Sequence, residues 1–191
     1  MAEGAKKRVV IAEDEAIIRL DLKEMLEEEG LQVVGEAADG EAAVRLATEA
    51  QPDLVIMDIK MPGMDGLSAA EQLAESGDTA VLILTAFSQR DLVQRAAEAG
   101  AMGYLVKPFQ KSDLMPAIEI ALARHAQVAA LKRESSDLTE QLETRKVVDR
   151  AKGKLIDGHG LSEADAFRYI QKKAMDERRP MKEVAASILE G

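Results

Sequence analysis

Five polar residues come directly after short hydrophobic segments of the sequence: Glu13, Asp14, Asp58, Thr85 and Lys107. If these segments are strands of one parallel sheet, the five side chains meet where the strands end, the edge at which open α/β sheets bind ligands. Three carboxylates without soft ligands favour a hard cation such as Mg²⁺. A cation beside a carboxylate and a lysine suits phosphoryl transfer, in which a carboxylate can be the nucleophile.

Each of these residues alone has a plainer explanation. An Asp at the end of a strand more often caps a helix, Thr85 fits an ordinary turn, and Lys107 fits a surface charge. The five residues, however, follow four different hydrophobic segments in the same way. Their combination favours a shared site over four unrelated explanations.

The hydrophobic segments alternate with amphipathic ones along the first part of the chain. Strands are expected at 9–11, 31–34, 54–57, 80–84 and 102–106, and helices at 17–26, 41–50, 67–74 and 91–99. The expected strands show no polar alternation, which is typical of a parallel sheet covered on both faces. This pattern predicts an α/β domain with a five-stranded, doubly wound parallel sheet.

The rest of the chain reads as helix only. No Gly or Pro occurs between Pro116 and Gly153, so a helix beginning near 111 is expected to continue to about 144. It carries a short heptad pattern, interrupted by Ser135, at Val128, Leu131, Leu138 and Leu142. This pattern fits either a solvated connecting helix or a short coiled coil that forms a dimer.

Three shorter helical patterns follow, at 147–156, 163–175 and 181–189. Ser162 and Asp165 have the spacing of an N-cap pair, and Pro180 fits a first helical turn. The tail is therefore expected to be a small three-helix unit.

The composition excludes several classes of site. The 191 residues contain no Cys and no Trp, and His125 and His159 are the only histidines. Disulfide scaffolds, thiolate metal sites and histidine-rich zinc sites are therefore ruled out. The apolar run at 80–84 is far shorter than the roughly 20 residues of a membrane span, and the N-terminus lacks the apolar stretch of a signal peptide. We expect a cytoplasmic protein that does not enter a membrane.

The formal net charge of -10 is distributed unevenly. Residues 1–120 contain 11 Lys and Arg against 23 Asp and Glu, whereas residues 145–182 contain 11 against 6. An acidic part joined to a basic tail suggests two modules with different partners.

Residues 8 to about 120 resemble the receiver domain of two-component response regulators, which has a flavodoxin-like fold. The resemblance depends on the segments AEDE at 12–15, DIKMPGMDG at 58–66, LTA at 84–86, GA at 100–101 and KPF at 107–109. It implies that a histidine kinase phosphorylates Asp58, and that Mg²⁺ is held by Glu13, Asp14, Asp58 and the backbone carbonyl of Lys60.

The same resemblance implies roles for three further residues. Thr85 would hydrogen-bond a phosphoryl oxygen, and Lys107 would pair with the acidic cluster or the phosphoryl group. Tyr104 matches the aromatic residue whose rotamer follows Thr85, although a half-buried strand aromatic is the plainer explanation. The peptide bond between Lys107 and Pro108 would be cis, as is usual in this family.

Residues 145–191 resemble the ANTAR domain, a family that binds RNA stem-loops as a dimer. The matching segments are 148–155, 161–167, 174–175 and 182–185. Independently, the tail has two basic stripes at helical spacing that suit RNA phosphates, with a tyrosine beside them that could stack on a base. These candidate RNA contacts are Lys146, Arg150, Lys154, Arg168, Lys172 and Tyr169. For any one of them, solvation of a helix or a place at the rim of the core is the simpler explanation.

The complete interpretation is a response regulator rather than an enzyme. It assigns residues 1–120 to a receiver, 121–144 to a connecting helix that forms a homodimer on phosphorylation, and 145–191 to an ANTAR-like RNA-binding domain that controls transcription antitermination or a related step. One rival is a phosphohydrolase with Asp58 as nucleophile, but such enzymes generally place an acid where this chain has Lys60. Another rival keeps the receiver and makes the tail a protein-docking or DNA-binding module, although the tail has no clear helix-turn-helix pattern.

Overall fold

The computed structural model describes residues 6–86 and 90–190. The chain divides into two compact units, residues 1–129 and 130–191. Residues 1–5, on which the expected lack of a signal peptide partly depends, lie outside the described ranges. No helix in those ranges combines the length and the hydrophobicity that crossing a membrane requires.

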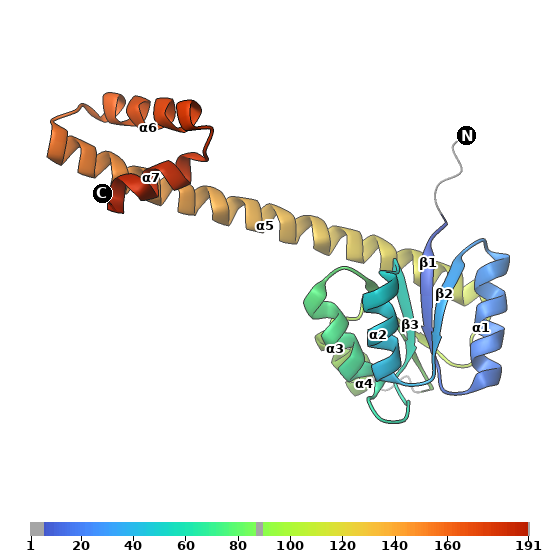
Figure 1. Cartoon of the computed structure of the whole chain (residues 1–191). Helices are drawn as coiled ribbons and strands as arrows, with labels where there is room; N and C mark the ends of the chain where they lie inside the picture. The colour runs from blue at the N-terminus through green and yellow to red at the C-terminus, as the bar shows by residue number, and fades with distance from the viewer. Residues whose placement is uncertain (1–5, 87–89, 191) are drawn as a thin grey trace. The chain divides into compact units, whose positions relative to one another are not determined.

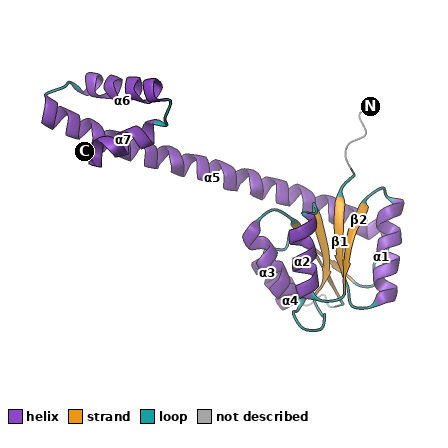
Figure 2. Cartoon of the chain, in the orientation of Figure 1, coloured by secondary structure: helices purple, strands orange, loops and turns teal. Residues whose placement is uncertain are grey.

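The first unit is an α/β domain built on five parallel strands in the order β2-β1-β3-β4-β5. The expectation of a five-stranded, doubly wound parallel sheet is therefore confirmed (Figures 1 and 2). The strands are β1 (Arg8–Ala12), β2 (Gln32–Ala37), β3 (Leu54–Asp58), β4 (Ala80–Thr85) and β5 (Gly103–Val106). The helices are α1 (Ala16–Glu28), α2 (Gly40–Ala50), α3 (Gly66–Ser76), α4 (Arg90–Glu98) and the beginning of α5 (Lys111–His159).

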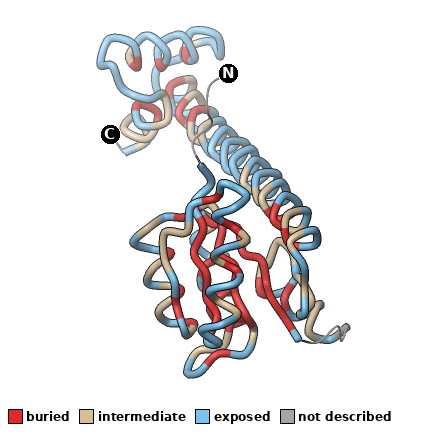
Figure 3. The backbone as a smooth tube through the Cα atoms, turned by 90° about the vertical axis from the view of Figure 1, so that its right-hand side faces the viewer, coloured by how far each residue is buried: buried red, intermediate tan, exposed pale blue. Residues whose placement is uncertain are grey.

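Helices cover both faces of the sheet. Alternate side chains of a strand point to opposite faces, so Val9 and Ile11 pack with α1 and α5, whereas Val10 and Ala12 pack with α2, α3 and α4. The three inner strands are almost completely buried (Figure 3). Burial on both faces explains why these strands are continuous hydrophobic runs in the sequence.

The edge strand β2 is longer than expected. It begins at Gln32 rather than Leu31 and continues through Gly35 and Glu36 to Ala37. Glu36 is exposed and Gly35 is a poor strand former, so neither residue carries the hydrophobic signal of a strand.

The second unit contains the last part of α5, α6 (Glu163–Glu177) and α7 (Met181–Glu190). Its core is formed by Val148, Ala151, Leu155, Ala166, Ile170, Ala174, Val184 and Ala185. The Ser162 hydroxyl accepts a hydrogen bond from the Asp165 amide at 3.1 Å, which confirms the expected N-cap. The expected three-helix tail is also confirmed.

The predicted interruption between the connecting helix and the first tail helix is wrong. Helix α5 is one element of 49 residues that includes 144–147 and also Gly153. A single glycine inside a helix costs only about 1 kcal/mol relative to alanine, and the packing of Val148, Ala151 and Leu155 in the second core compensates for it.

Candidate functional site

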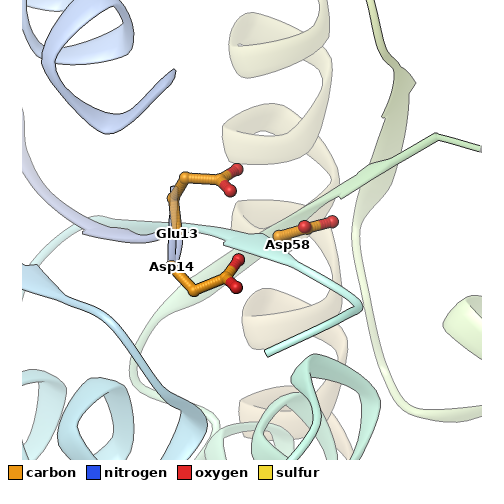
Figure 4. Close-up of side chains that lie close together, drawn as sticks. All are labelled: Glu13, Asp14 and Asp58. Atoms are coloured by element: carbon orange, nitrogen blue, oxygen red, sulfur yellow. The ribbon is translucent and has the colours of Figure 1, made fainter. Parts of the chain in front are cut away.

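The carboxylates of Glu13, Asp14 and Asp58 gather at the carboxyl ends of β1 and β3. Because β2 and β3 lie on opposite sides of β1, these ends form the switch point of the sheet, where open α/β sheets bind ligands. One oxygen from each carboxylate lies within 4.8 Å of the others, and Figure 4 shows the three side chains lying close together. An all-oxygen, anionic donor set of this kind fits Mg²⁺.

The Asp58 side chain is held at both of its oxygens. Oδ1 accepts a hydrogen bond from the Ile59 amide at 2.8 Å, and Oδ2 lies 3.0 Å from the Lys107 ammonium nitrogen. Asp58 is only 8% exposed, so the carboxylate has a defined orientation in a largely dry environment. Lys107 also reaches Oε2 of Glu13 at 2.5 Å, and so the residue that follows β5 is connected to acidic residues at the carboxyl ends of β1 and β3.

Burial and ion pairing oppose each other at this lysine and its partner. Burial raises the pKa of Glu13, and the neighbouring Lys107 ammonium only partly reverses the rise. For Lys107, burial alone lowers the pKa, but its hydrogen bonds to Glu13 and Asp58 outweigh burial, and the net pKa is raised. The lysine therefore stays protonated beside the carboxylates.

The remaining predicted residues of this site lie around the same edge. Thr85 is buried at the end of β4, and its backbone carbonyl accepts a hydrogen bond from the Lys107 amide at 2.7 Å. Lys60 is exposed in the loop after β3, and Tyr104 in β5 is 46% exposed, so about half of its surface is buried, as expected of a strand aromatic at this position. The peptide bond between Lys107 and Pro108 is cis, as expected.

Two further residues, Gly66 and Arg19, contact this site, although the sequence alone did not indicate these contacts. Gly66 begins α3 so close to Asp58 that a Cβ on it would lie 2.0 Å from the Asp58 carbonyl oxygen. Arg19 donates a hydrogen bond from Nη1 to the Glu13 carbonyl at 2.5 Å. The sequence carries two indirect signals for these contacts. One is a glycine directly after the capping Asp65, and the other is an arginine in the first turn of the helix that follows the acidic turn.

In the second unit the basic side chains differ in how far they are already paired. Lys146 is ion-paired with Glu143, and Arg168 with Asp165, at 2.9 Å and 2.8 Å. Arg150 and Lys172 are exposed and make no ion pair with any residue that the structure describes. Lys154 donates to the Leu189 carbonyl at 3.1 Å, and Tyr169 is 48% exposed.

The apolar residues of the heptad pattern are exposed on α5. Val128, Leu131, Leu138 and Leu142 are 38%, 64%, 54% and 60% exposed. A single chain thus leaves this seam uncovered.

Comparison with known proteins assigns a family to each part of the chain. Residues 9–119 match the response regulator receiver domain. Residues 136–189 match the ANTAR domain. The chain is a response regulator of the ANTAR type.

Full-length and single-domain relatives agree with this assignment. The response regulator is 59% identical over 184 residues to the transcriptional regulatory protein PdtaR of Mycobacterium tuberculosis. This alignment covers 96% of this chain and 90% of PdtaR. The signal receiver domain of the response regulator NarL from the same species has a TM-score of 0.60 at 33% identity, covering 62% of this chain and 97% of that one. A chain of the CheX–CheY–BeF₃–Mg²⁺ complex from Borrelia burgdorferi has a TM-score of 0.57 at 28% identity, covering 59% and 86%.

The family assignment agrees with the predicted combination of a receiver and an ANTAR domain. A receiver domain implies a histidine kinase as partner, and an ANTAR domain implies RNA as a ligand. The family to which this response regulator belongs is one of regulators of gene expression rather than of known enzymes.

Proposed function

We propose that a sensor histidine kinase phosphorylates this response regulator on Asp58, and that phosphorylation controls RNA binding by its tail. The observation that carries the proposal is the buried contact at the sheet edge: Asp58 lies 3.0 Å from Lys107, beside the carboxylates of Glu13 and Asp14. This combination of an oriented nucleophile, a cation and further acidic ligands suits phosphoryl transfer to a carboxylate.

In the proposed step, a carboxylate oxygen of Asp58 forms a bond to the phosphorus of a kinase phosphohistidine. The P–N bond breaks, and its electron pair returns to the imidazole ring. The Ile59 amide fixes the carboxylate through Oδ1, and the Lys107 ammonium stabilises the negative charge at the transferring group. Thr85 then donates a hydrogen bond to a phosphoryl oxygen, and Tyr104 changes its rotamer in response.

The acidic cluster holds Mg²⁺ in this proposal. Glu13, Asp14, Asp58 and the backbone carbonyl of Lys60 would hold the ion, which would neutralise charge on the phosphoryl oxygens. Two observations support the assignment: the carboxylate oxygens lie within 4.8 Å of one another, and the similar chain from B. burgdorferi belongs to a complex with BeF₃ and Mg²⁺.

We further propose a division of labour along the chain. Residues 1–120 act as the receiver, 121–144 as a connecting helix, and 145–191 as the module that binds RNA stem-loops in transcription antitermination or a related step. The uncovered seam on α5 supports dimerisation through the connecting helix. A dimer presents two tails, and an RNA with two stem-loops then gains affinity through effective concentration without new contacts per tail.

The ion pairs of the tail rank the candidate RNA contacts. Arg150 and Lys172 are the strongest candidates because no acidic side chain among the described residues neutralises them. Lys154 is also exposed, whereas Lys146 and Arg168 would have to give up Glu143 and Asp165 before they could bind phosphates. Tyr169 remains a candidate for stacking on an unpaired base.

Labelling by acetyl phosphate with Mg²⁺ tests the receiver half of the proposal. Asp58→Asn is expected to abolish acid-labile labelling because an amide cannot act as the nucleophile. Asp65→Asn is the matched control: Asp65 lies in the same loop and caps α3, a role that asparagine also fills. Undiminished labelling of Asp58→Asn contradicts the assignment.

Binding to one-stem and two-stem RNAs, with and without phosphorylation, tests the output half. Phosphorylation is expected to tighten binding to the two-stem RNA far more than to the one-stem RNA. Arg150→Ala and Lys172→Ala are each expected to weaken binding and to lower the salt slope by about 1, whereas Arg168→Ala has a smaller effect. If the protein binds no stem-loop RNA, whether or not it is phosphorylated, the proposal is contradicted.

A further inference from the structure

Arg19 reaches back from the first turn of α1 to the acidic turn that precedes the helix. Its Nη1 donates to the Glu13 carbonyl at 2.5 Å, and its side chain is only 21% exposed. Glu15, the N-cap residue of α1, makes no side-chain capping bond. The backbone between β1 and α1 is therefore held by Arg19 from within the helix and by the Glu13 carboxylate, which accepts from the Glu15 amide at 3.3 Å, rather than by an ordinary N-cap.

A carboxylate on a neighbouring strand holds Arg19 in turn. Oε2 of Glu36 in β2 lies 3.6 Å from Nε of Arg19, and the Glu36 carboxylate also accepts from Lys23 at 2.7 Å. The adjacent Ala37 carbonyl accepts a hydrogen bond from the Glu13 amide at 3.0 Å. Glu13 is thus tied to β2 twice, directly through its amide and indirectly through Arg19.

We propose that Arg19 is a positioning residue for cation binding, holding the Glu13 carbonyl against β2 so that the Glu13 and Asp14 carboxylates are aligned toward Asp58. The inference rests on the proposed role of these carboxylates in binding Mg²⁺. Residues that orient the ligands of a metal typically change its affinity by 10–100-fold when replaced. We therefore expect loss of the guanidinium to weaken Mg²⁺ binding at least tenfold.

Two simpler roles for Arg19 predict different results. If Arg19 acted only through its charge, removing a cation beside an anionic site would tighten Mg²⁺ binding. If it made only a surface ion pair with Glu36, its loss would slightly lower the unfolding free energy and leave Mg²⁺ affinity unchanged. The direction of the change in affinity therefore separates positioning from both alternatives.

The experiment is a titration of the full chain with MgCl₂, followed by the amide NMR signals of Glu13, Asp14 and Asp58. Arg19→Gln removes the guanidinium, and Glu36→Gln weakens its support without touching the acidic turn. Lys23→Gln is the matched control, because it breaks the other ion pair of Glu36 and leaves the bond between Arg19 and Glu13 in place. Urea unfolding of each variant confirms that the comparison is made between folded proteins.

We expect the apparent Mg²⁺ dissociation constant to rise at least tenfold in Arg19→Gln, to rise less in Glu36→Gln, and to stay near the wild-type value in Lys23→Gln. An Arg19→Gln affinity equal to or tighter than wild type overturns the positioning role, and so does an equal loss in Lys23→Gln. If Arg19→Gln does not fold, an unchanged Mg²⁺ affinity in Glu36→Gln overturns the positioning role of Arg19. A wild-type protein whose acidic-turn signals ignore Mg²⁺ overturns the proposed cation site itself, and the inference with it.

Discussion

Replacing Gly66 with alanine tests how firmly the position of Asp58 depends on the start of α3. A Cβ on Gly66 would lie 2.0 Å from the Asp58 carbonyl oxygen, 2.9 Å from its carbonyl carbon and 3.1 Å from Cα of Ile59. Gly66 itself is in ordinary helical conformation. The substitution is therefore opposed by lack of space rather than by backbone strain.

The size of the effect follows from these distances. To reach normal contact, the new Cβ and the Asp58 carbonyl must separate by more than about 1 Å. The hydrogen bond from the Gly66 amide to the Ile59 carbonyl, 2.9 Å long, couples the two segments, so Asp58, the proposed nucleophile, takes part of the shift. Crowding of this kind costs about 1–3 kcal/mol. The unfolding free energy of a typical domain is about 5–15 kcal/mol, so the protein should stay folded. Misplacing a reacting group by about 1 Å lowers a rate by about 100-fold. Because only part of the shift falls on Asp58, which the sheet holds in place, we expect a smaller loss of labelling rate, about tenfold.

The assay is the initial rate of labelling by acetyl phosphate in saturating Mg²⁺, with urea unfolding of the same samples. Gly63→Ala is the matched control: Gly63 has a φ of 71°, and no atom lies within 4 Å of a Cβ placed on it. Alanine there strains the backbone of the same loop by roughly 1 kcal/mol without crowding Asp58, so its labelling rate should stay near wild type. A Gly66→Ala protein that is labelled as fast as wild type would refute the reasoning.

Three further predictions concern other parts of the molecule. Asp14→Asn should weaken Mg²⁺ binding by about 2 kcal/mol, because a unit charge about 4 Å from a divalent ion in water contributes roughly that much; unchanged affinity by calorimetry would exclude Asp14 as a ligand. Burial alone raises the pKa of Asp53, but the Arg8 amide and the Lys7 ammonium outweigh burial, and the net pKa is lowered. Asp53→Asn should therefore lower the unfolding free energy at neutral pH, by less than about 1 kcal/mol because the ion pair is exposed. This difference from wild type should vanish as the pH falls through the lowered pKa. An unfolding free energy difference between wild type and Asp53→Asn that stays constant from about pH 7 to about pH 2, across the usual pKa of Asp, would contradict this. Leu138→Gln should prevent the phosphorylated protein from dimerising in sedimentation experiments and remove its preference for two-stem RNA, and a dimer of normal stability would show that the seam is not the interface.

The sheet could be predicted because its chemistry is local in the sequence. Strands β1, β3 and β4 are buried on both faces, so each is an uninterrupted hydrophobic run that ends at a polar residue. Parallel strands end at the same edge, and this alone places Glu13, Asp58 and Lys107 together, as the distances confirm. The edge strand β2 was less visible because its exposed side requires no hydrophobic residues.

Contacts that depend on tertiary packing could not be predicted in the same way. The ion pair between Arg168 and Asp165 is not such a contact, because the two residues are three apart on one helix and their spacing alone indicates the pair. The bond from Arg19 to Glu13, in contrast, depends on the angle at which α1 leaves the sheet. Only the folded chain shows that Lys152 bridges Asp149 on its own helix and Glu163 on α6.

Asp58 is part of the sheet rather than of a loop, and this limits how the protein can respond to a change at that residue. Its backbone is in register with Leu84, and the next amide, Ile59, donates to the Leu84 carbonyl at 3.2 Å. Moving Asp58 would open the end of two fully buried strands, the kind of structure whose amide hydrogens usually exchange last. The backbone of a modified Asp58 is therefore expected to stay in place, so neighbouring residues must rearrange around the added charge. Slow hydrogen exchange in β3 should persist after phosphorylation, while β5, which carries the exposed Tyr104, should be where exchange rates change.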